Sequence, residues 1–286
     1  MVAFSIPSWF RIILLVLTIV SFLPQYYRII KRADCSGISL TYALLNAAAF
    51  TEQIAIALFG VLRFDSDLYR PPGVNGWVDF AQCALACVCS LGIFAAVLNL
   101  QPERRGARAA SFVIYVVYVV IFVGPVILLA TAGPWKADEG MKGGDILVGL
   151  VHGIHTVFVD PILTILGLGA AVWAQALETS RRSSSPGALS VPGLGAQAVA
   201  FALLAICWPW RFDHGNSSGR DVLYWYRFFG WTYIHNALYA VGQAVLWWVA
   251  ARRAAIGANG DLTILPETEP LLRSQATMGE PLNESR

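Results

Sequence analysis

The chain alternates between long apolar runs and short charged connectors, and this alternation limits what it can fold into. A helix needs roughly 20 mostly apolar residues to cross a bilayer. A soluble domain would also need more charged surface than 13% charged residues can supply. We therefore predict an all-α polytopic membrane protein with seven transmembrane helices. The predicted spans are Ser8–Ile30, Leu40–Leu62, Gly76–Leu98, Arg108–Ala132, Pro161–Thr179, Val191–Trp210 and Phe228–Ala251.

A further apolar segment, Ile146–Phe158, precedes the fifth span. The sequence allows two structures for this segment. It either lengthens the fifth helix, or lies as a short interfacial piece broken at Asp160-Pro161, because a proline disfavours helical geometry in the residue before it.

Unbalanced basic residues gather in alternate connectors, and this predicts the orientation. Such bases flank the first, third and fifth loops and follow the last span, whereas the loops between them match their bases with acids. The unbalanced bases are Arg28, Lys31 and Arg32, then Arg104, Arg105 and Arg108, then Arg181 and Arg182, and finally Arg252 and Arg253. Cytoplasmic loops carry the excess of Lys and Arg, so we expect a luminal or external N-terminus and a cytosolic C-terminus. The glycosylation sequon at Asn216 then falls on the luminal side. Because the bases are scattered among loops, the net charge of +2 gives no reason to expect a nucleic-acid partner.

The first span contains a proline-glutamine pair, Pro24-Gln25, just before the basic cluster. Proline removes one backbone hydrogen bond from a helix and bends it. The carbonyl that loses its donor needs a partner in a medium without water, and we expect the amide of Gln25 to supply it. The pair is thus a candidate hinge.

Three short motifs in this region resemble the PQ-loop repeat family, and its cystinosin-like members most closely. They are Pro24-Gln25, Ser36-Gly37-Ile38-Ser39, and Leu44-Leu45-Asn46 followed by Phe50. The resemblance implies two parallel three-helix repeats joined by a linking helix, and a small-solute transporter of the vacuolar or lysosomal membrane. The alternative is a kinked helix followed by an ordinary cytoplasmic turn.

A degenerate copy of this pattern occurs in the second half of the chain. When the second half of the sequence is shifted onto the first so that Gln175 falls on Gln25, Gly187 falls on Gly37. Ala174 then stands where the first half has Pro24. One extra residue follows in the turn, so that Gln197 falls one position after the place of Asn46. We therefore predict a first repeat over 1–100, a linking helix and luminal loop over 101–140, a second repeat over 141–254 and a disordered tail over 255–286. Gln175 becomes a second candidate for gating.

The tail contains Glu267, Leu271 and Leu272 in the spacing of an acidic dileucine signal. Such a signal is an address that adaptor complexes read on an exposed cytosolic segment. It predicts delivery to a lysosome or vacuole.

Polar groups inside a bilayer are costly, so each is a candidate for function. The candidates for the substrate or proton pathway are Asn46, Glu52, Gln53, Asp79, Gln197, His235 and Asn236. Glu52 is either a titrating carboxyl or a structural hydrogen-bond partner. The family resemblance implies that Asp79 is linked to protons, but an acid near a helix N-terminus is also favoured by the helix dipole. His235 is either titratable or a hydrogen-bonded structural histidine.

No nucleophile elbow, phosphate loop or dinucleotide fingerprint occurs, so we expect neither an enzyme nor a cofactor. His152 and His155 have metal-compatible spacing but lack an evident third ligand. The expected partners are the lipid bilayer, protons, a small solute and an adaptor complex. We predict a proton-coupled transporter of amino acids or related metabolites. The alternative is a non-transporting membrane protein, either a sorting receptor or a trafficking or lipid-asymmetry factor.

Overall fold

The computed structural model describes residues 6–63, 74–101, 105–131, 143–181, 187–211 and 230–262, and every regular element in these ranges is helical. The elements are α1 (Ser8–Arg32), α2 (Leu40–Arg63), α3 (Val74–Leu100), α4 (Arg105–Tyr118), η2 (Val119–Val123), α5 (Gly124–Thr131), α6 (Gly143–Ile154), η3 (His155–Val159), η4 (Ile162–Gly167), α7 (Leu168–Arg181), α8 (Val191–Cys207), η5 (Pro209–Arg211) and α10 (Trp231–Leu262).

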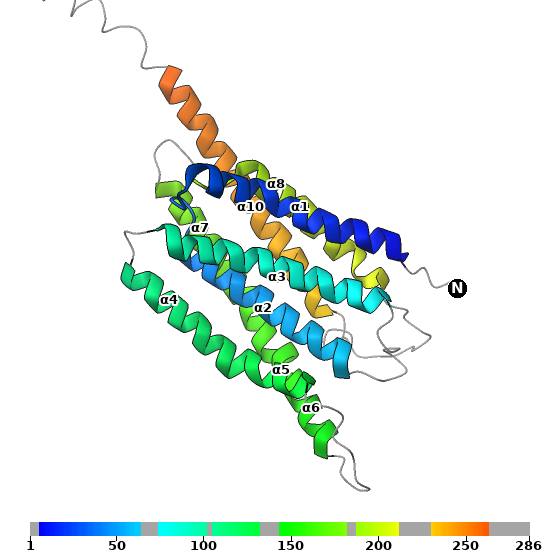
Figure 1. Ribbon diagram of the computed structural model, residues 1–286. Helices are drawn as coiled ribbons and strands as arrows, with labels where there is room; N and C mark the ends of the chain where they lie inside the picture. Colours follow the sequence, from blue (N-terminus) through cyan, green and yellow to red (C-terminus); the bar gives the residue numbers. More distant parts are fainter. Residues whose placement is uncertain are drawn as a thin grey trace, which may run out of the picture.

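Within the described ranges these elements form seven long rods that alternate in direction (Figure 1). α4, η2 and α5 form one rod, and α6, η3, η4 and α7 form another. The fold-class prediction of an all-α polytopic membrane protein is confirmed. Among the described residues, five helical stretches are long and apolar enough to cross a bilayer, and α8 is apolar but shorter. The five are Ser8–Arg32, Leu40–Leu62, Val74–Leu100, Arg105–Thr131 and Gly149–Arg181.

The fifth of these stretches runs through Asp160-Pro161 without a break. Ile146–Phe158 therefore lengthens the helix, which is the first of the two alternatives, and the fifth span begins before Pro161. Pro161 has no N–H to donate to the preceding turn. The chain accommodates this loss with the π turns of η3 and η4 on either side of it. Pro125 follows the π turn η2 in the same way.

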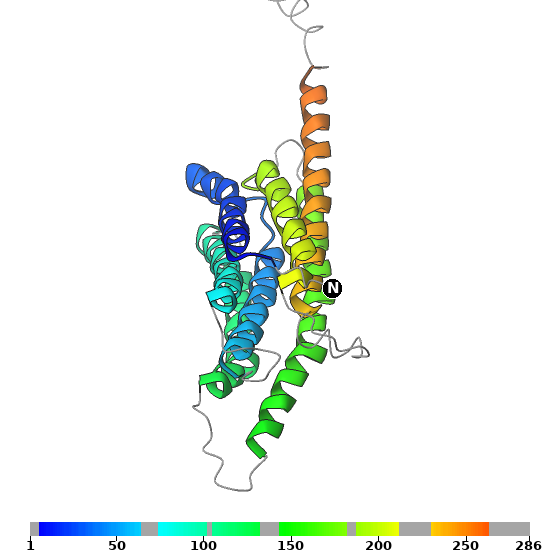
Figure 2. The same ribbon diagram turned by 90° about the vertical axis from the view of Figure 1, so that its right-hand side faces the viewer.

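Two sets of three helices pack against each other. α1, α2 and α3 form the N-terminal trio, in which α3 contacts both α1 and α2; α7, α8 and α10 form the C-terminal trio, in which α10 contacts both α7 and α8. Between the trios α1 packs on α8 and α2 packs on α7. Figure 2 shows the two trios as adjacent layers. The rod of α4, η2 and α5 packs against α2.

A glycine permits the close approach of the third helix to the first in each trio. A Cβ on Gly92 would lie 2.1 Å from the hydroxyl of Tyr26, and one on Gly242 would lie 2.6 Å from Cγ2 of Val172. The shift that places Gln175 on Gln25 also places Gly242 on Gly92. The two trios therefore have equivalent glycines where the third helix meets the first, although the side chains that these glycines meet are not equivalent.

The outer surfaces are apolar, as lipid contact requires. α4 has no buried residue, and α1 exposes apolar side chains such as Ile12, Val16 and Val20. The ends of α1 and α7 carry the basic residues Arg32 and Arg181, and we call this end of the bundle the basic end. α10 continues to Leu262 and so extends into the segment expected to form the tail.

Candidate functional site

Two glutamines join the trios at the basic end. Gln25 Nε2 donates to the carbonyl of Ala188 (2.9 Å), and its Oε1 accepts from the backbone N–H of Ser190 (2.8 Å). Gln175 Nε2 donates to the carbonyl of Gly37 (2.7 Å), and its Oε1 accepts from the N–H of Ser39 (2.8 Å). Each glutamine thus binds the turn of the other trio, and we call these four bonds the glutamine clasp.

The clasp corrects one expectation about Gln25. The carbonyl that lacks a donor because of Pro24 lies one turn back on α1, but the Gln25 amide does not bond to it. A side-chain amide offers both a donor group, its NH₂, and an acceptor, its carbonyl oxygen. It therefore matches a turn that presents both a free N–H and a free C=O, whereas the helix has only a carbonyl to satisfy.

Aromatic and amide side chains continue inward from the clasp. The hydroxyl of Tyr42 pairs with Gln243 (3.1 Å), and Tyr239 donates to Gln197 (3.1 Å). Asn46 donates to the carbonyl of Tyr42 in its own helix. Asn46 and Gln197 are therefore both buried and hydrogen-bonded, and they lie between the clasp and the centre of the bundle.

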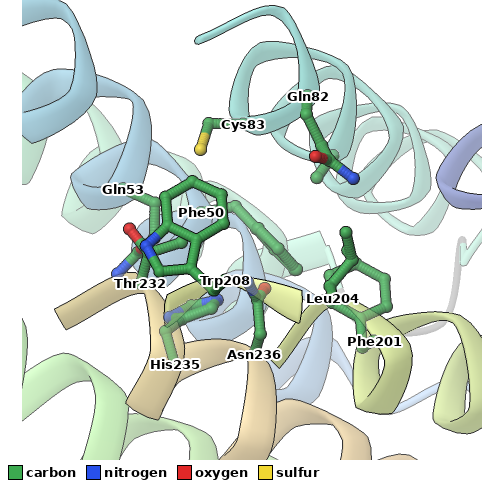
Figure 3. A pocket seen from close by; sticks show the side chains of 11 residues that line it. Phe50, Gln53, Gln82, Cys83, Phe201, Leu204, Trp208, Thr232, His235 and Asn236 are labelled. Carbon is green, nitrogen blue, oxygen red and sulfur yellow. The ribbon is translucent and has the colours of Figure 1, made fainter. Parts of the chain in front are cut away.

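Near the centre, the two trios line a small cavity of about 20 Å³, part of which is open to the surroundings. Figure 3 shows its lining side chains arranged around a central space. Three of the predicted pathway residues, Gln53, His235 and Asn236, belong to this lining. The others are Phe50, Gln82, Cys83, Ala86, Phe201, Leu204, Trp208 and Thr232.

The lining contains pairs of positions that the sequence shift relates. The shift of the two glutamines places Thr232 on Gln82 and Asn236 on Ala86. With the one extra residue of the second turn included, it places Phe201 on Phe50 and Leu204 on Gln53. Both trios therefore supply equivalent positions to one cavity.

Glu52 lies beside the cavity wall but faces away from it. It is fully buried; its Oε1 lies 2.5 Å from Nδ1 of His155, and its Oε2 accepts from the hydroxyl of Tyr118 (2.7 Å). Its neighbour Gln53 donates to Asp160 Oδ1 (2.7 Å). Asp160 is a further buried acid in the rod of α6, η3, η4 and α7, and the sequence analysis missed it because the predicted fifth span began at Pro161.

Asp79 lies in a buried ion cluster at the end opposite the clasp. Arg11 Nη1 lies 2.5 Å from Asp79 Oδ2, and Arg211 Nη1 lies 2.6 Å from Oδ1. We call these three residues the arginine cluster; its formal charge is +1. Arg211 also stacks on Trp208 of the cavity wall, with 4.6 Å between the guanidinium carbon and the ring centroid. Neither arginine was predicted, although Arg11 inside an apolar run was a visible signal.

Several expectations lie outside the described residues. They concern Asn216, Glu267, Leu271 and Leu272. In the part of the chain that is described, no three His, Cys, Asp or Glu side chains come together as metal ligands. His155 pairs with Glu52, and His152 stacks on Phe59 (5.5 Å between ring centroids).

Comparison with known proteins gives one match. Residues 6–62 match the PQ loop repeat, a repeat found in membrane transporters and related proteins. The matched segment spans α1 and nearly all of α2, including Pro24, Gln25 and the turn before α2. No curated protein and no solved structure matches the chain.

Proposed function

Starting from a PQ loop repeat at residues 6–62, we propose that this multi-pass membrane protein carries a small solute through the cavity between its two trios. The observation that carries the proposal is the pairing of the lining residues. A cavity built from equivalent positions of two helix sets can be reached from either membrane face when the sets rock against each other.

The two trios are, in this proposal, an intact repeat and a degenerate one related by an axis along the membrane normal. Three observations support this: the reciprocal glutamine bonds, the glycines Gly92 and Gly242, and the paired lining positions. The rod of α4, η2 and α5 then serves as the linking helix that lets both repeats point the same way. Pro24 and Gln25 form the hinge of the first repeat, and Gln175 is its counterpart.

Each end of the cavity has its own closure. At the basic end the four bonds of the glutamine clasp hold the trios together. At the opposite end Arg11 and Asp79 belong to the N-terminal trio, and Arg211 follows α8 of the C-terminal trio. Opening one end while the other stays closed is the gating that alternating access requires.

We further propose that the carrier is coupled to protons through Asp79 and Glu52. A proton on Asp79 removes the negative charge that holds Arg11 and Arg211 together, and this favours separation of the trios at that end. Glu52 and His155 form a buried pair that can hold or share one proton. Both acids touch elements outside their own helix, so their charge state bears on helix packing.

The orientation and the organelle belong to the same proposal. The basic end faces the cytosol, the arginine cluster faces the lumen, and Asn216 is glycosylated there. Glu267, Leu271 and Leu272 direct the protein to a vacuole or lysosome through an adaptor complex. Replacing Leu271 and Leu272 by Ala should move the protein to the cell surface; an unchanged location rejects the address.

Uptake by purified protein in liposomes tests the carrier function. With the outside acidified, a panel of labelled amino acids, organic amines, polyols and related metabolites should contain at least one solute that accumulates, and dissipating the pH gradient should stop accumulation. Glu52→Gln and Asp79→Asn should each reduce the dependence on the gradient. Asn99→Leu, which removes an exposed amide that bonds only within its own helix, is the control.

Two outcomes count against the proposal. Uptake that keeps its pH dependence in both acid variants removes the coupling role. No uptake of any solute in the panel favours the rival function, a sorting receptor or a trafficking or lipid-asymmetry factor. The replacement of the second proline by Ala174 supports that rival.

A further inference from the structure

We propose that the cavity selects a compact solute that presents several N–H or O–H donors and no anionic group. This inference rests on the proposed function, since it takes the cavity, widened as the trios separate, as the solute site. It follows from the direction of the hydrogen bonds behind the cavity wall, which fixes what the wall offers to a ligand.

The first fixed group is the amide of Gln82. Its Nε2 lies 3.1 Å from the hydroxyl of Thr18, and that hydroxyl already donates its proton to the carbonyl of Leu14 (2.9 Å). Thr18 can therefore only accept from Gln82, which fixes the amide nitrogen on that side. The other amide atom, Oε1, is left as an acceptor, and it has no hydrogen-bond partner among the described residues.

The second fixed group is the ring of His235. Thr164 donates its hydroxyl proton to Asp160 Oδ1 (3.1 Å) and lies 3.3 Å from Nδ1 of His235. Because Thr164 has no second proton, Nδ1 of the histidine carries the hydrogen and donates. Nε2 of the neutral ring is then an acceptor, and it too lacks a partner in the described part of the chain.

Two further groups complete the set. Gln53 gives its amide N–H to the carboxylate of Asp160 (2.7 Å), so its Oε1 is an acceptor without a partner in the described ranges. The hydroxyl of Thr232 likewise finds no partner there. All four side chains line the cavity and are at most 3% exposed (Figure 3).

Three acceptors and one hydroxyl, deeply buried and unpaired, are costly unless a ligand or water brings donors to them. The eleven lining residues include no Lys or Arg that could pair with an anion, and Arg211, which stacks on Trp208, is already paired with Asp79. The aromatic rings of Phe50 and Phe201 also belong to the wall and are attractive to a cation, whereas the ring of Trp208 already carries Arg211. An organic ammonium and a polyol share the required chemistry, whereas a carboxylate does not.

Three ring compounds of similar size separate these classes. Cyclohexylamine brings an ammonium, myo-inositol brings hydroxyls, and cyclohexanecarboxylate brings an anion without a donor. Calorimetric titration of the full chain in nanodiscs at pH 7 should show binding of the amine, the polyol or both, and none of the carboxylate. In Gln82→Glu the introduced carboxylate should favour the amine over inositol. This variant therefore shows whether the bound donors belong to an ammonium or to hydroxyl groups.

Two variants on opposite walls test the site itself. Gln82→Met and Thr232→Val keep the side-chain shape but remove an acceptor, and each should weaken donor binding about tenfold. Asn99→Leu should leave it unchanged, and thermal melting checks that every variant is folded.

Tight binding of the carboxylate, or no binding of either donor compound, overturns the inference. Donor binding that both acceptor variants leave unchanged also overturns it. Donor binding without uptake into liposomes supports the inference while it contradicts the carrier function. Uptake of a solute that carries no donors supports the carrier function while it contradicts the inference.

Discussion

Gln25 and Gln175 make the same pair of hydrogen bonds in opposite directions across the boundary between the trios. Gln25 binds the backbone of Ala188 and Ser190, and Gln175 binds that of Gly37 and Ser39, at 2.7–2.9 Å. The shift that relates the two glutamines also relates the turns that they bind, once the extra residue of the second turn is included. Separation of the trios at the basic end therefore requires four hydrogen bonds to break together.

Removing one half of the clasp should destabilise the fold. Gln25→Leu or Gln175→Leu leaves one N–H and one C=O of a buried turn without a partner, at a cost of about 1–3 kcal/mol per group in soluble proteins and less in a bilayer. Both variants should lower the melting temperature in detergent by similar amounts. Asn99→Leu, the exposed control, should melt like the wild type.

Because both glutamines act on one boundary, the double variant should lose less than the sum of the single losses. Strict additivity would show that the two halves of the clasp are energetically independent.

Asp79 neutralisation should destabilise more than loss of either arginine. Asp79→Asn raises the charge of the arginine cluster from +1 to +2 and leaves both guanidiniums unpaired. Breaking a buried pair in this way costs about 3–5 kcal/mol. Arg11→Met instead leaves one balanced pair between Asp79 and Arg211.

The melting temperature should therefore fall further for Asp79→Asn than for Arg11→Met. Adding Arg11→Met to Asp79→Asn should recover part of the loss. If the double variant melts no higher than Asp79→Asn alone, the charge imbalance is not the cause.

Gly242 should not tolerate a methyl group. Alanine there would place its Cβ 2.6 Å from Val172 Cγ2, and overpacking costs about 1–3 kcal/mol, which outweighs the roughly 1 kcal/mol that alanine gains as a helix former. Val172→Ala should restore the stability of Gly242→Ala. At Gly169 nothing lies within 4 Å of the added Cβ, so Gly169→Ala should be neutral or stabilising.

The thiol of Cys35 in the turn after α1 should be unreactive while the protein is folded. Burial, together with the adjacent Asp34, raises the pKa of Cys35 from 9.0 to about 11. In a variant that keeps only this cysteine, a disulfide reagent at pH 7.5 should react at the rate of unfolding. Immediate reaction of the folded protein contradicts the burial.

The same shift makes stability depend on pH. The unfolded chain forms the thiolate above about pH 9, whereas the folded chain resists it up to about pH 11. The stability that the neutral thiol contributes is therefore present below pH 9 and is lost as the pH rises to 11. A Cys35→Ser variant should lack this step.

The sequence was sufficient for the helices, because seven long apolar runs have few other structures available. It also located Gln25, Gln175 and the cavity residues Gln53, His235 and Asn236, since polar groups in an apolar run stand out. The predicted partner of Gln25 was wrong because the prediction considered only the neighbouring turn of the same helix. The actual partner, Ala188, belongs to the other trio and is far away in the sequence.

Other parts of the site could not be found from one span at a time. Gln82 and Thr232 are ordinary polar residues until the trios bring them to one cavity. Trp208 is one of several tryptophans near the ends of the apolar runs, but it is buried in the cavity wall under Arg211. Its position depends on packing between the trios, which the periodic pattern of apolar residues in the sequence does not predict.

A carrier that works by alternating access must exchange between two arrangements of its trios. Spin labels at the exposed positions Lys31 and Arg181, in a chain without its native cysteines, report the distance between the ends of α1 and α7 by double electron–electron resonance. We predict two distance populations whose ratio changes between pH 7.5 and pH 5, with the longer distance enriched by Gln25→Leu. A single distance that neither pH nor Gln25→Leu alters would contradict the alternating opening of the cavity.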